Sequence, residues 1–439
     1  MKNLDNLISL LTSEIQEAFR EITFEELEEE LRNFMKELGR KVLQKCLDRI
    51  AREKGYGYRG PVVEVNGREA VFERYEIRKI KTYFGEVSLK RAYYWFPDGE
   101  EPKGYVPLDE DLELSPREYS PSLEKGIAMV GIEAPFAKAS RLLKELALVE
   151  PSPKTIEEIT QEKGREVRKK RKEKAEESWK IFEGLSCAGV ERKGKVEIRK
   201  TALPTLTSPP RRLYVQVDGG RVNTKEGWKE PKVGVIFKEE SKVEVSEGHG
   251  SILEKEYIAT LEGVEEFEKL MWEALLRWGV MEAEEVVLEG DGAEWIWNRI
   301  GGELCPGAKE VLDWAHAKEH LWKCGRAIFE EEGERERWAK EIEGLLLEGR
   351  VAEVIERLNA LEGKEEVKDL IRYYESNKER MKYKEYIEAG IYIGSGAVES
   401  GVKNVVNARM KGCGMRWDRE RAENMLHLRA EYLSGRWPS

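Results

Sequence analysis

Three acidic residues lie where a predicted strand or helix meets a glycine turn, and carboxylates in such places can bind a ligand. Asp218 ends the apolar run "LYVQVDGG", and Asp291 ends "VVLEGDG". Glu399 follows the glycine-rich turn of "IGSGAVES" and stands near the start of a predicted helix. The ligands of α/β sheets bind at the carboxyl ends of strands, and glycine lets a backbone or an ion approach closely. We therefore predict a site made from these three carboxylates.

The chemistry that suits three such carboxylates is phosphoryl transfer with two metal ions. Mg²⁺ prefers oxygen ligands and keeps coordination positions open for substrate oxygens. Two ions about 4 Å apart stabilise both the attacking and the leaving oxygen of a phosphodiester. We expect two Mg²⁺ ions, replaceable by Mn²⁺, with Asp218 bridging both and with Asp291 and Glu399 completing one ion each.

Basic and amide side chains follow Glu399 at helical spacing. Steps of four residues place Lys403, Asn407 and Lys411 behind Glu399 on one stripe of a helix. Such a stripe would follow the phosphates of a DNA strand, and a nearby tryptophan can stack on bases. The expected DNA contacts of this segment are Lys403, Asn407, Arg409, Lys411, Arg416 and Trp417.

The elements that must position the carboxylates follow from the hydrophobic periodicity. Residues 205–330 predict three meandering strands and then strands alternating with helices, which is typical of a mixed sheet with helices on its faces. Residues 331–390 are helical and highly charged, and they read as an inserted helical block. Residues 391–439 hold the final catalytic helix and a basic tail. The expected fold class is α/β.

The first half of the chain predicts a DNA-binding region. Residues 1–115 combine a long helix with a small antiparallel β unit. In residues 116–200, two helices flank the turn "VEPSPKT" and lead into the basic run "REVRKKRKEK". This pattern favours a helix-turn-helix, although helical hairpins that bind no DNA share it. Residues 201–212 read as a linker. The expected DNA contacts here are Lys154, Arg165, Arg168, Lys169, Lys170 and Arg171.

Composition limits the class of protein. The net charge is −11, but the basic run and the basic tail remain compatible with DNA binding. Five cysteines are dispersed without a CxxC pair, which favours reduced thiols in a cytoplasm over disulfides or a zinc ribbon. No apolar stretch approaches the roughly 18 residues of a membrane span. We expect a cytoplasmic protein associated with the nucleoid and with no membrane partner.

The motifs together resemble the DDE transposases of bacterial insertion sequences, in particular the Kra-type group, which is similar in layout to Mutator-like enzymes. The resemblance rests on "YVQVDGGRV", "LEGDGAEWIW", "VLDWAHAKEHLW" and "GSGAVESGVKNVVNARMKGCGMRW" and covers about residues 80–439. It implies a ribonuclease-H-like core with Asp218, Asp291 and Glu399 as the metal-binding triad. In "DWAH", we expect the strand-end Asp313 and His316, one helical turn later, to meet near the site. His316 would orient a scissile phosphate or assist proton transfer.

Relatives in that group carry a cysteine-rich zinc element near residues 92–110, where this chain has no cysteine. Apolar packing must then hold the β unit. The resemblance implies an enzyme that cuts DNA at the element ends and transfers the strands into target DNA. Its partners would be terminal inverted repeats, target DNA and at least one further copy of the chain.

Other interpretations remain open. A non-catalytic DNA-binding protein derived from such an enzyme, or a ribonuclease-H-like nuclease or resolvase without strand transfer, has the same motifs. "HAKEH" also fits the inverted zincin pattern, with His316 and His320 as zinc ligands and Glu319 between them. "GSGAVESG" imitates a dinucleotide-binding loop, but it follows only a short apolar run and lacks an acid about twenty residues later.

Overall fold

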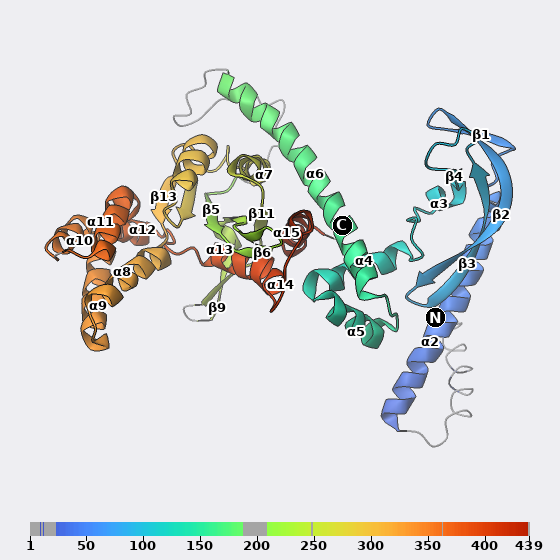
Figure 1. The fold of residues 1–439 in the computed structure, drawn as a ribbon, viewed down its shortest axis with the longest axis horizontal. Helices are drawn as coiled ribbons and strands as arrows, with labels where there is room; N and C mark the ends of the chain where they lie inside the picture. Colours follow the sequence, from blue (N-terminus) through green and yellow to red (C-terminus); the bar gives the residue numbers. More distant parts are fainter. Residues whose placement is uncertain are drawn as a thin grey trace. The chain divides into compact units, whose positions relative to one another are not determined.

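The structure is a computed structural model that describes residues 9, 12, 23–187, 209–246, 249–361 and 363–437. The chain divides into two compact units, Met1–Ile159 and Thr160–Ser439 (Figure 1). Most of the helix expected before residue 23 lies outside the described residues, and so does most of the expected linker at 201–212.

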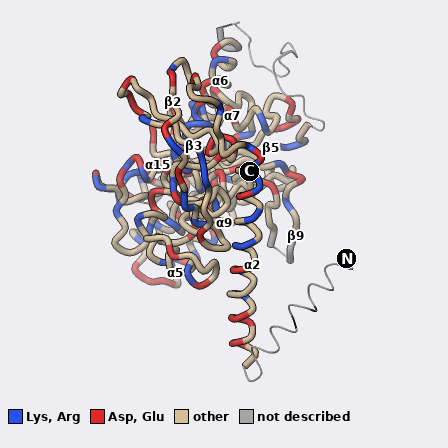
Figure 2. Tube along the Cα trace, turned by 90° about the vertical axis from the view of Figure 1, so that its right-hand side faces the viewer, with Lys and Arg blue, Asp and Glu red and all other residues tan. Residues whose placement is uncertain are grey.

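The first unit combines a long helix with an antiparallel sheet. Helix α2 (Phe24–Glu53) begins at Thr23, whose hydroxyl accepts from the Glu26 amide while the Glu26 carboxylate accepts from the Thr23 amide, a capping box. Acidic and basic residues follow one another along α2 (Figure 2). The sheet contains β1 (Val62–Val65), β2 (Arg68–Thr82), β3 (Gly85–Trp95) and β4 (Gly104–Tyr105) in that order.

Two apolar clusters hold this β unit together. Val87 and Leu89 of β3 pack with Ile80, Ala51 of α2 and Leu108, and all five side chains are buried. The second cluster consists of Ala70, Ala92, Tyr94 and Phe96. The apolar packing expected in place of a zinc element is therefore present.

Four helices follow the sheet: α3 (Pro107–Asp111), α4 (Pro121–Glu133), α5 (Phe136–Ala147) and α6 (Pro153–Cys187). Helix α6 begins within the expected turn "VEPSPKT", where the Ser152 hydroxyl accepts from the Thr155 amide at 3.1 Å. The two helices of the expected helix-turn-helix correspond to α5 and α6. At 35 residues, α6 is about 52 Å long, and it continues from the first unit into the second.

A five-stranded mixed sheet forms the centre of the second unit. Its order is β11-β8-β5-β12-β13. Strand β8 runs antiparallel to both of its neighbours, while β5, β12 and β13 run parallel to one another. The mixed α/β architecture expected from the sequence is confirmed. The bounds are β5 (Arg212–Gly219), β8 (Lys232–Lys238), β11 (Glu256–Thr260), β12 (Glu285–Gly290) and β13 (Lys309–Leu312).

Helices cover both faces of this sheet. Successive strand residues point to opposite sides, so two neighbouring residues of β8 contact the two layers of helices. At Gly234 of β8, an added Cβ would lie 2.5 Å from the sulfur of Met271 in α7 (Val264–Arg277). The next residue, Val235, faces α13 (Gly396–Gly401), where a Cβ at Gly401 would lie 3.1 Å from the Val235 side chain. Figure 1 shows α7 and α13 on opposite sides of the strands.

Several short elements were not predicted from the sequence. A hairpin of β6 (Val222–Thr224) and β7 (Gly227–Lys229) follows β5, and another of β9 (Lys242–Ser246) and β10 (His249–Ile252) follows β8. The third of the three meandering strands, expected at 253–260, is β11 and begins only at Glu256. The helix after Asp291 is a π-helix, Ile296–Leu304. The inserted block contains α9 (Glu332–Leu347), α10 (Val351–Asn359), α11 (Glu365–Asn377) and α12 (Tyr383–Glu388), after α8 (Trp314–Ile328).

The segment that was expected to form the last helix of the core is not one regular helix. It consists of α13, a π-helix at Val402–Asn407 and α14 (Ala408–Met410), and α15 (Arg419–Leu433) follows after a loop. A π turn inserts an extra residue, and Lys411 lies beyond the last helical residue. The expected stripe with steps of four is therefore wrong past Lys403.

Among the described residues, Cys46, Cys305, Cys324 and Cys413 are free thiols. A search of the same residues finds no helix with the length and apolar character needed to cross a membrane.

Candidate functional site

Three aspartates stand in a row at the carboxyl ends of the three parallel strands. The strand register pairs Val217 of β5 with Gly290 of β12, and Gly290 with Leu312 of β13. The next residue on each strand is an aspartate, namely Asp218, Asp291 and Asp313. Neighbouring strands lie about 4.8 Å apart, so the three carboxylates share one edge of the sheet.

The hydrogen bonds of the first two aspartates leave oxygen atoms for a ligand. Asp218 Oδ1 accepts from the Gly219 amide at 2.6 Å, and Asp291 Oδ1 accepts from the Ala293 amide at 2.9 Å. Within the described part of the chain, the other oxygen of each carboxylate has no hydrogen-bond partner. Burial raises the pKa of Asp218, and the charges of Asp291 and Asp313 raise it further against the Gly219 hydrogen bond and the charge of His316. A cation would relieve this repulsion.

Asp313 differs from its neighbours because its carboxylate is fully engaged. It is 1% exposed and caps α8 by accepting from the amides of Ala315 and His316, each at 3.2 Å. It also contacts His316 Nδ1 at 2.6 Å and accepts from the Ser395 amide at 2.9 Å. The hydrogen bonds from His316 and Ser395 lower the pKa of Asp313 although burial opposes this.

His316 carries a positive charge at neutral pH. Its hydrogen bond to Asp313 raises its pKa to about 9 against the effect of burial, and the charges of Asp313, Asp218 and Asp291 contribute. Sequence reasoning placed an aspartate and a histidine one helical turn apart near the site, and the structure brings them into contact. An imidazolium beside carboxylates can bind a phosphate.

The turn that carries Glu399 is bound to the strand ends on both sides. Besides the Ser395 bond to Asp313, the Trp314 amide donates to the Ile393 carbonyl at 2.8 Å. On the β5 side, the Val398 amide donates to Gln216 Oε1 at 3.0 Å. These bonds fix the entry to α13 above β5 and β13.

A buried carboxyl group supports this turn from below. Gln216 donates to Glu289 on the neighbouring strand, and Glu289 is 0% exposed. Burial raises the pKa of Glu289 well above its ordinary value, and the charge of Asp313 adds to the rise. This direction has a simple cause, because a charged carboxylate in a fully buried place is costly.

Glu399 itself is exposed, and it forms no ion pair with Lys403 in the described structure. Across the described ranges, no three His, Cys, Asp or Glu side chains lie close enough together to hold one metal ion. The strand register brings Asp218, Asp291 and Asp313 to one edge of the sheet, with His316 bound to Asp313. Within the described residues, no hydrogen bond or ion pair joins the Glu399 side chain to them. The donor chemistry of Asp218 and Asp291 fits Mg²⁺, which prefers carboxylate oxygens.

The inserted helical block also reaches this edge of the sheet. The Tyr373 hydroxyl of α11 donates to the Asp291 carbonyl at 2.7 Å, and its ring stacks on His320 of α8 with centroids 3.9 Å apart. His316 is bound to Asp313 and His320 is stacked on Tyr373, so their geometry gives no support to the zincin alternative.

The expected DNA contacts after Glu399 differ in exposure. Lys403, Lys411 and Arg416 are exposed, whereas the buried Asn407 Oδ1 has no hydrogen-bond partner in the described residues. Arg409 is 2% exposed and lies over the ring of Trp417, which is 8% exposed. These two buried side chains close the loop onto the core, which argues against the expected DNA contact for both.

The basic run of α6 divides into two faces. Arg168 pairs with Glu262, and Arg171 lies 3.7 Å from Glu431 with its side chain 11% exposed. These two arginines join this part of α6 to other elements of the same unit, which argues against the expected DNA contact for them. The remaining expected contacts are exposed, namely Lys154, Arg165, Lys169 and Lys170.

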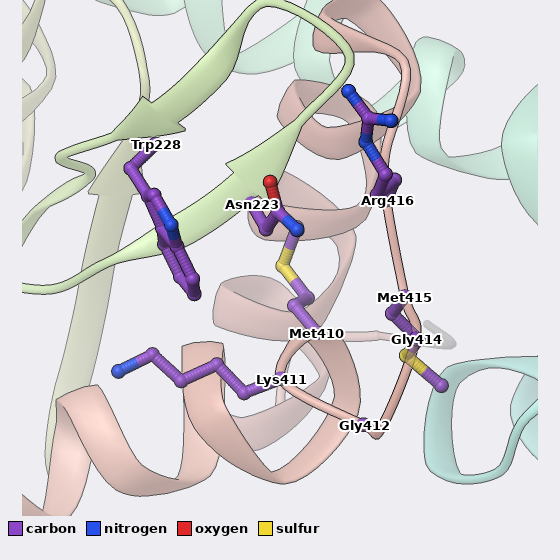
Figure 3. A pocket seen from close by; sticks show the side chains of 8 residues that line it. All are labelled: Asn223, Trp228, Met410, Lys411, Gly412, Gly414, Met415 and Arg416. Atoms are coloured by element: carbon purple, nitrogen blue, oxygen red, sulfur yellow. The ribbon is translucent and has the colours of Figure 1, made fainter.

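The sequence identified Asp313 of "VLDW" as a strand-end acid beside His316 but left it out of the predicted metal-binding triad. Trp228 on β7 was missed; it is 65% exposed and lines a pocket together with Lys411 and Arg416 (Figure 3). A tryptophan after a glycine turn in "NTKEGWK" was the available signal.

Comparison with known proteins places the chain in a family. A stretch of 137 residues is 36% identical to the "UPF0236 protein in vanSb 3'region" of Streptococcus gallolyticus. This stretch covers 31% of the chain and 28% of that relative, so the chain spans less than a third of the relative's length. The sequence model of the Uncharacterised protein family (UPF0236) matches residues 18–437. Because this match covers nearly the whole chain, the protein belongs to the uncharacterised protein family UPF0236.

Proposed function

We propose that this protein is a metal-dependent DNA transposase of the DDE type, which cleaves DNA at the ends of an insertion sequence and transfers them into target DNA. The observation that carries the proposal is the strand register. It sets Asp218 and Asp291 side by side at the ends of adjacent parallel strands, while hydrogen bonds from Ser395 and Val398 attach the Glu399 turn to the same edge.

The sheet topology supports a ribonuclease-H-like core. In chain order, the first to fifth strands of the central sheet are β5, β8, β11, β12 and β13. Across the sheet they lie in the order third, second, first, fourth, fifth, and only the second strand runs antiparallel to the others. That is the arrangement expected of such a core. The crossover from the third strand to the fourth brings the fourth strand beside the first, so that the carboxylates at their ends share one edge although 73 residues separate Asp218 from Asp291 along the chain.

Each side chain has a distinct role in this proposal. Asp218, Asp291 and Glu399 would hold two Mg²⁺ ions, which activate a nucleophilic oxygen and stabilise the leaving oxygen when bound. His316, positively charged and fixed by Asp313, orients a scissile phosphate. Glu289 and Gln216 position the turn that carries Glu399. Tyr373 fixes the backbone of Asp291 from the inserted block.

Exposed cations would guide the DNA toward this edge. On the catalytic side these are Lys403, Lys411 and Arg416, and on α6 they are Arg165, Lys169 and Lys170. Each phosphate that such a cation contacts releases counterions, so binding weakens steeply with salt. Two DNA ends must be cut and joined together, so we propose that the protein acts as a dimer or a larger assembly.

A cleavage assay tests the proposal. Purified protein is incubated with supercoiled plasmid that carries the two DNA segments flanking its reading frame, in Mg²⁺, in Mn²⁺ or in EDTA. We expect nicks at the segment ends in Mg²⁺ or Mn²⁺ only, and joined products when precleaved ends and a target plasmid are supplied. Asp218→Asn and Asp291→Asn should abolish both reactions and leave binding to the ends intact.

The matched control is Glu294→Gln, which removes an exposed acid three residues after Asp291 and should cleave like the wild type. Cleavage without joining would support a nuclease or resolvase instead. Binding to the ends without cleavage in either metal would support a DNA-binding protein without catalysis. Cleavage that survives Asp218→Asn would contradict the assignment of the site.

A further inference from the structure

A pocket of about 310 Å³ lies between the β6–β7 hairpin and the loop that follows α14. Figure 3 shows Trp228 of β7 and Lys411 of the loop reaching into the same space, with Asn223 of β6 beside them. Arg416 lies on the other side of Asn223. Pockets for small ligands span about 300 to 1,000 Å³, so this volume suits one small planar group.

The walls of the pocket are firmly joined. The Trp417 amide donates to the Asn223 carbonyl at 2.9 Å, and the Lys225 amide donates to the Trp417 carbonyl at 2.8 Å. The buried Trp417 ring donates from Nε1 to the Met410 carbonyl at 3.2 Å. Trp417 therefore fixes the loop to the hairpin, and the space between them is a built feature of the second unit.

The side chains of the pocket define the chemistry of a ligand. Trp228 offers an open indole face and is 65% exposed. Lys411 is exposed and has no ion-pair partner in the described part of the chain. The half-buried amide of Asn223 can both donate and accept hydrogen bonds. A ligand that uses all three side chains is planar, carries hydrogen-bonding groups and is negatively charged.

The local charge points to the same ligand. The two segments that form the pocket, residues 219–229 and 411–417, contain five basic residues and one acid, Glu226. This excess stands out in a chain whose net charge is −11. The five basic residues are Arg221, Lys225, Lys229, Lys411 and Arg416.

We propose that this pocket binds an unpaired nucleotide of DNA, with its base stacked on Trp228 and its phosphates held by Lys411 and Arg416. A base in a duplex is already stacked and cannot enter such a pocket without leaving the helix. The inference rests on the proposed function, because the same segment carries Glu399. Twelve residues separate Glu399 from Lys411, which is about 18 Å along a helix. The pocket thus holds a base that is unpaired next to the cleavage site.

Oligonucleotides with 2-aminopurine test this inference, because the fluorescence of this base falls when it stacks. The base is placed in turn at each position of a single-stranded overhang on an end segment, and at the same positions in a full duplex. We expect the full-length protein to quench one or two overhang positions and none in the duplex. Trp228→Ala should remove the quenching and weaken overhang binding about 5- to 150-fold, whereas Trp228→Phe should keep most of both.

The matched control is Ile387→Ala, which removes another large exposed side chain, 51% exposed, from helix α12 of the inserted block. It should bind and quench like the wild type. Lys411→Ala should weaken binding and reduce its salt dependence by about one phosphate contact, while the bound overhang is still quenched.

Equal affinity of wild type and Trp228→Ala for the overhang, without any change in quenching, overturns the inference. Absence of DNA binding by the wild type also overturns it. The outcomes separate this inference from the proposed function. Quenching that depends on Trp228 in a protein that never cleaves DNA would support the pocket and contradict the catalytic proposal. Cleavage by a protein in which Trp228 affects neither quenching nor binding would support the catalytic proposal and contradict the pocket.

Discussion

The contact between Asp313 and His316 can be tested with Asp313→Asn, which keeps the shape of the side chain and one carbonyl oxygen. That oxygen can still accept from the Ser395 amide, but the amide nitrogen cannot accept from His316 Nδ1. In the wild type, the Asp313 hydrogen bond is the largest of the effects that raise the His316 pKa from 6.5 to about 9. We therefore expect the His316 pKa to fall by about two units, toward its ordinary value of about 6.5.

The same change has a consequence for stability. Because the folded-state pKa of His316 is raised above the unfolded value, the pair stabilises the fold fully below pH 6.5, and this stabilisation is lost as the pH rises through about 9. A difference of 2.5 units at 1.36 kcal/mol per unit is about 3 kcal/mol. Between pH 6.5 and 9, the free energy of unfolding should fall by about this amount in the wild type and stay nearly level in the variant.

NMR of protein labelled with ¹³C-histidine measures the pKa directly, because the chain has four histidines and His316→Gln assigns the signal. Urea unfolding at pH 6, 7.5 and 9.5 gives the stability. The reasoning is refuted if His316 titrates near 6.5 in the wild type, or if Asp313→Asn leaves its titration unchanged.

Three further changes have defined outcomes. Burial would raise the pKa of Glu256, but the hydrogen bond from Arg277 and the charges of Arg277 and Arg436 hold it at about 2 instead of 4.5. The stabilisation of about 3 kcal/mol that follows is present above pH 4.5 and is lost toward pH 2. The stability difference between the wild type and Glu256→Gln, followed by circular dichroism, should shrink across that range. Gly401→Ala should lower the free energy of unfolding by about 1–3 kcal/mol, because the added Cβ would lie 3.1 Å from the Val235 side chain of β8. In Gly396→Ala the added Cβ meets nothing within 4 Å, so thermal unfolding should stay unchanged. Trp417→Ala should lower the free energy of unfolding by about 3–5 kcal/mol, because the ring is buried. If its melting temperature falls no further than that of Trp228→Ala, which removes an exposed ring, the structural role of Trp417 is contradicted.

The ends of the strands could be predicted from the sequence, but the pairing of the strands could not. Apolar runs that stop at Asp-Gly identify Asp218 and Asp291, because a buried strand needs apolar residues and its end does not. Asp313 joins them only through the register of β12 and β13, which no local pattern records. The exposed position of Glu399 likewise depends on how the turn at 393–398 is bound.

Burial of basic residues could not be read from charge patterns. Arg409 and Arg171 stand among other bases in the sequence, yet tertiary contacts with Trp417 and Glu431 bury them. A helical stripe also assumes a regular helix, and the π-helix at Val402–Asn407 breaks that assumption. Which face of a helix meets solvent is decided by its partners as much as by its own sequence.

We propose above all that the ends of β5 and β12 form a metal site for DNA cleavage. Crystals of the protein with an end-segment DNA, grown with Mn²⁺ in place of Mg²⁺, would show the metal by its anomalous scattering. We expect anomalous peaks in contact with Asp218 and Asp291, one of them also bound to Glu399, and no such peaks in Asp218→Asn. Ordered Mn²⁺ elsewhere with none at these two aspartates, or a metal held between His316 and His320, would contradict it.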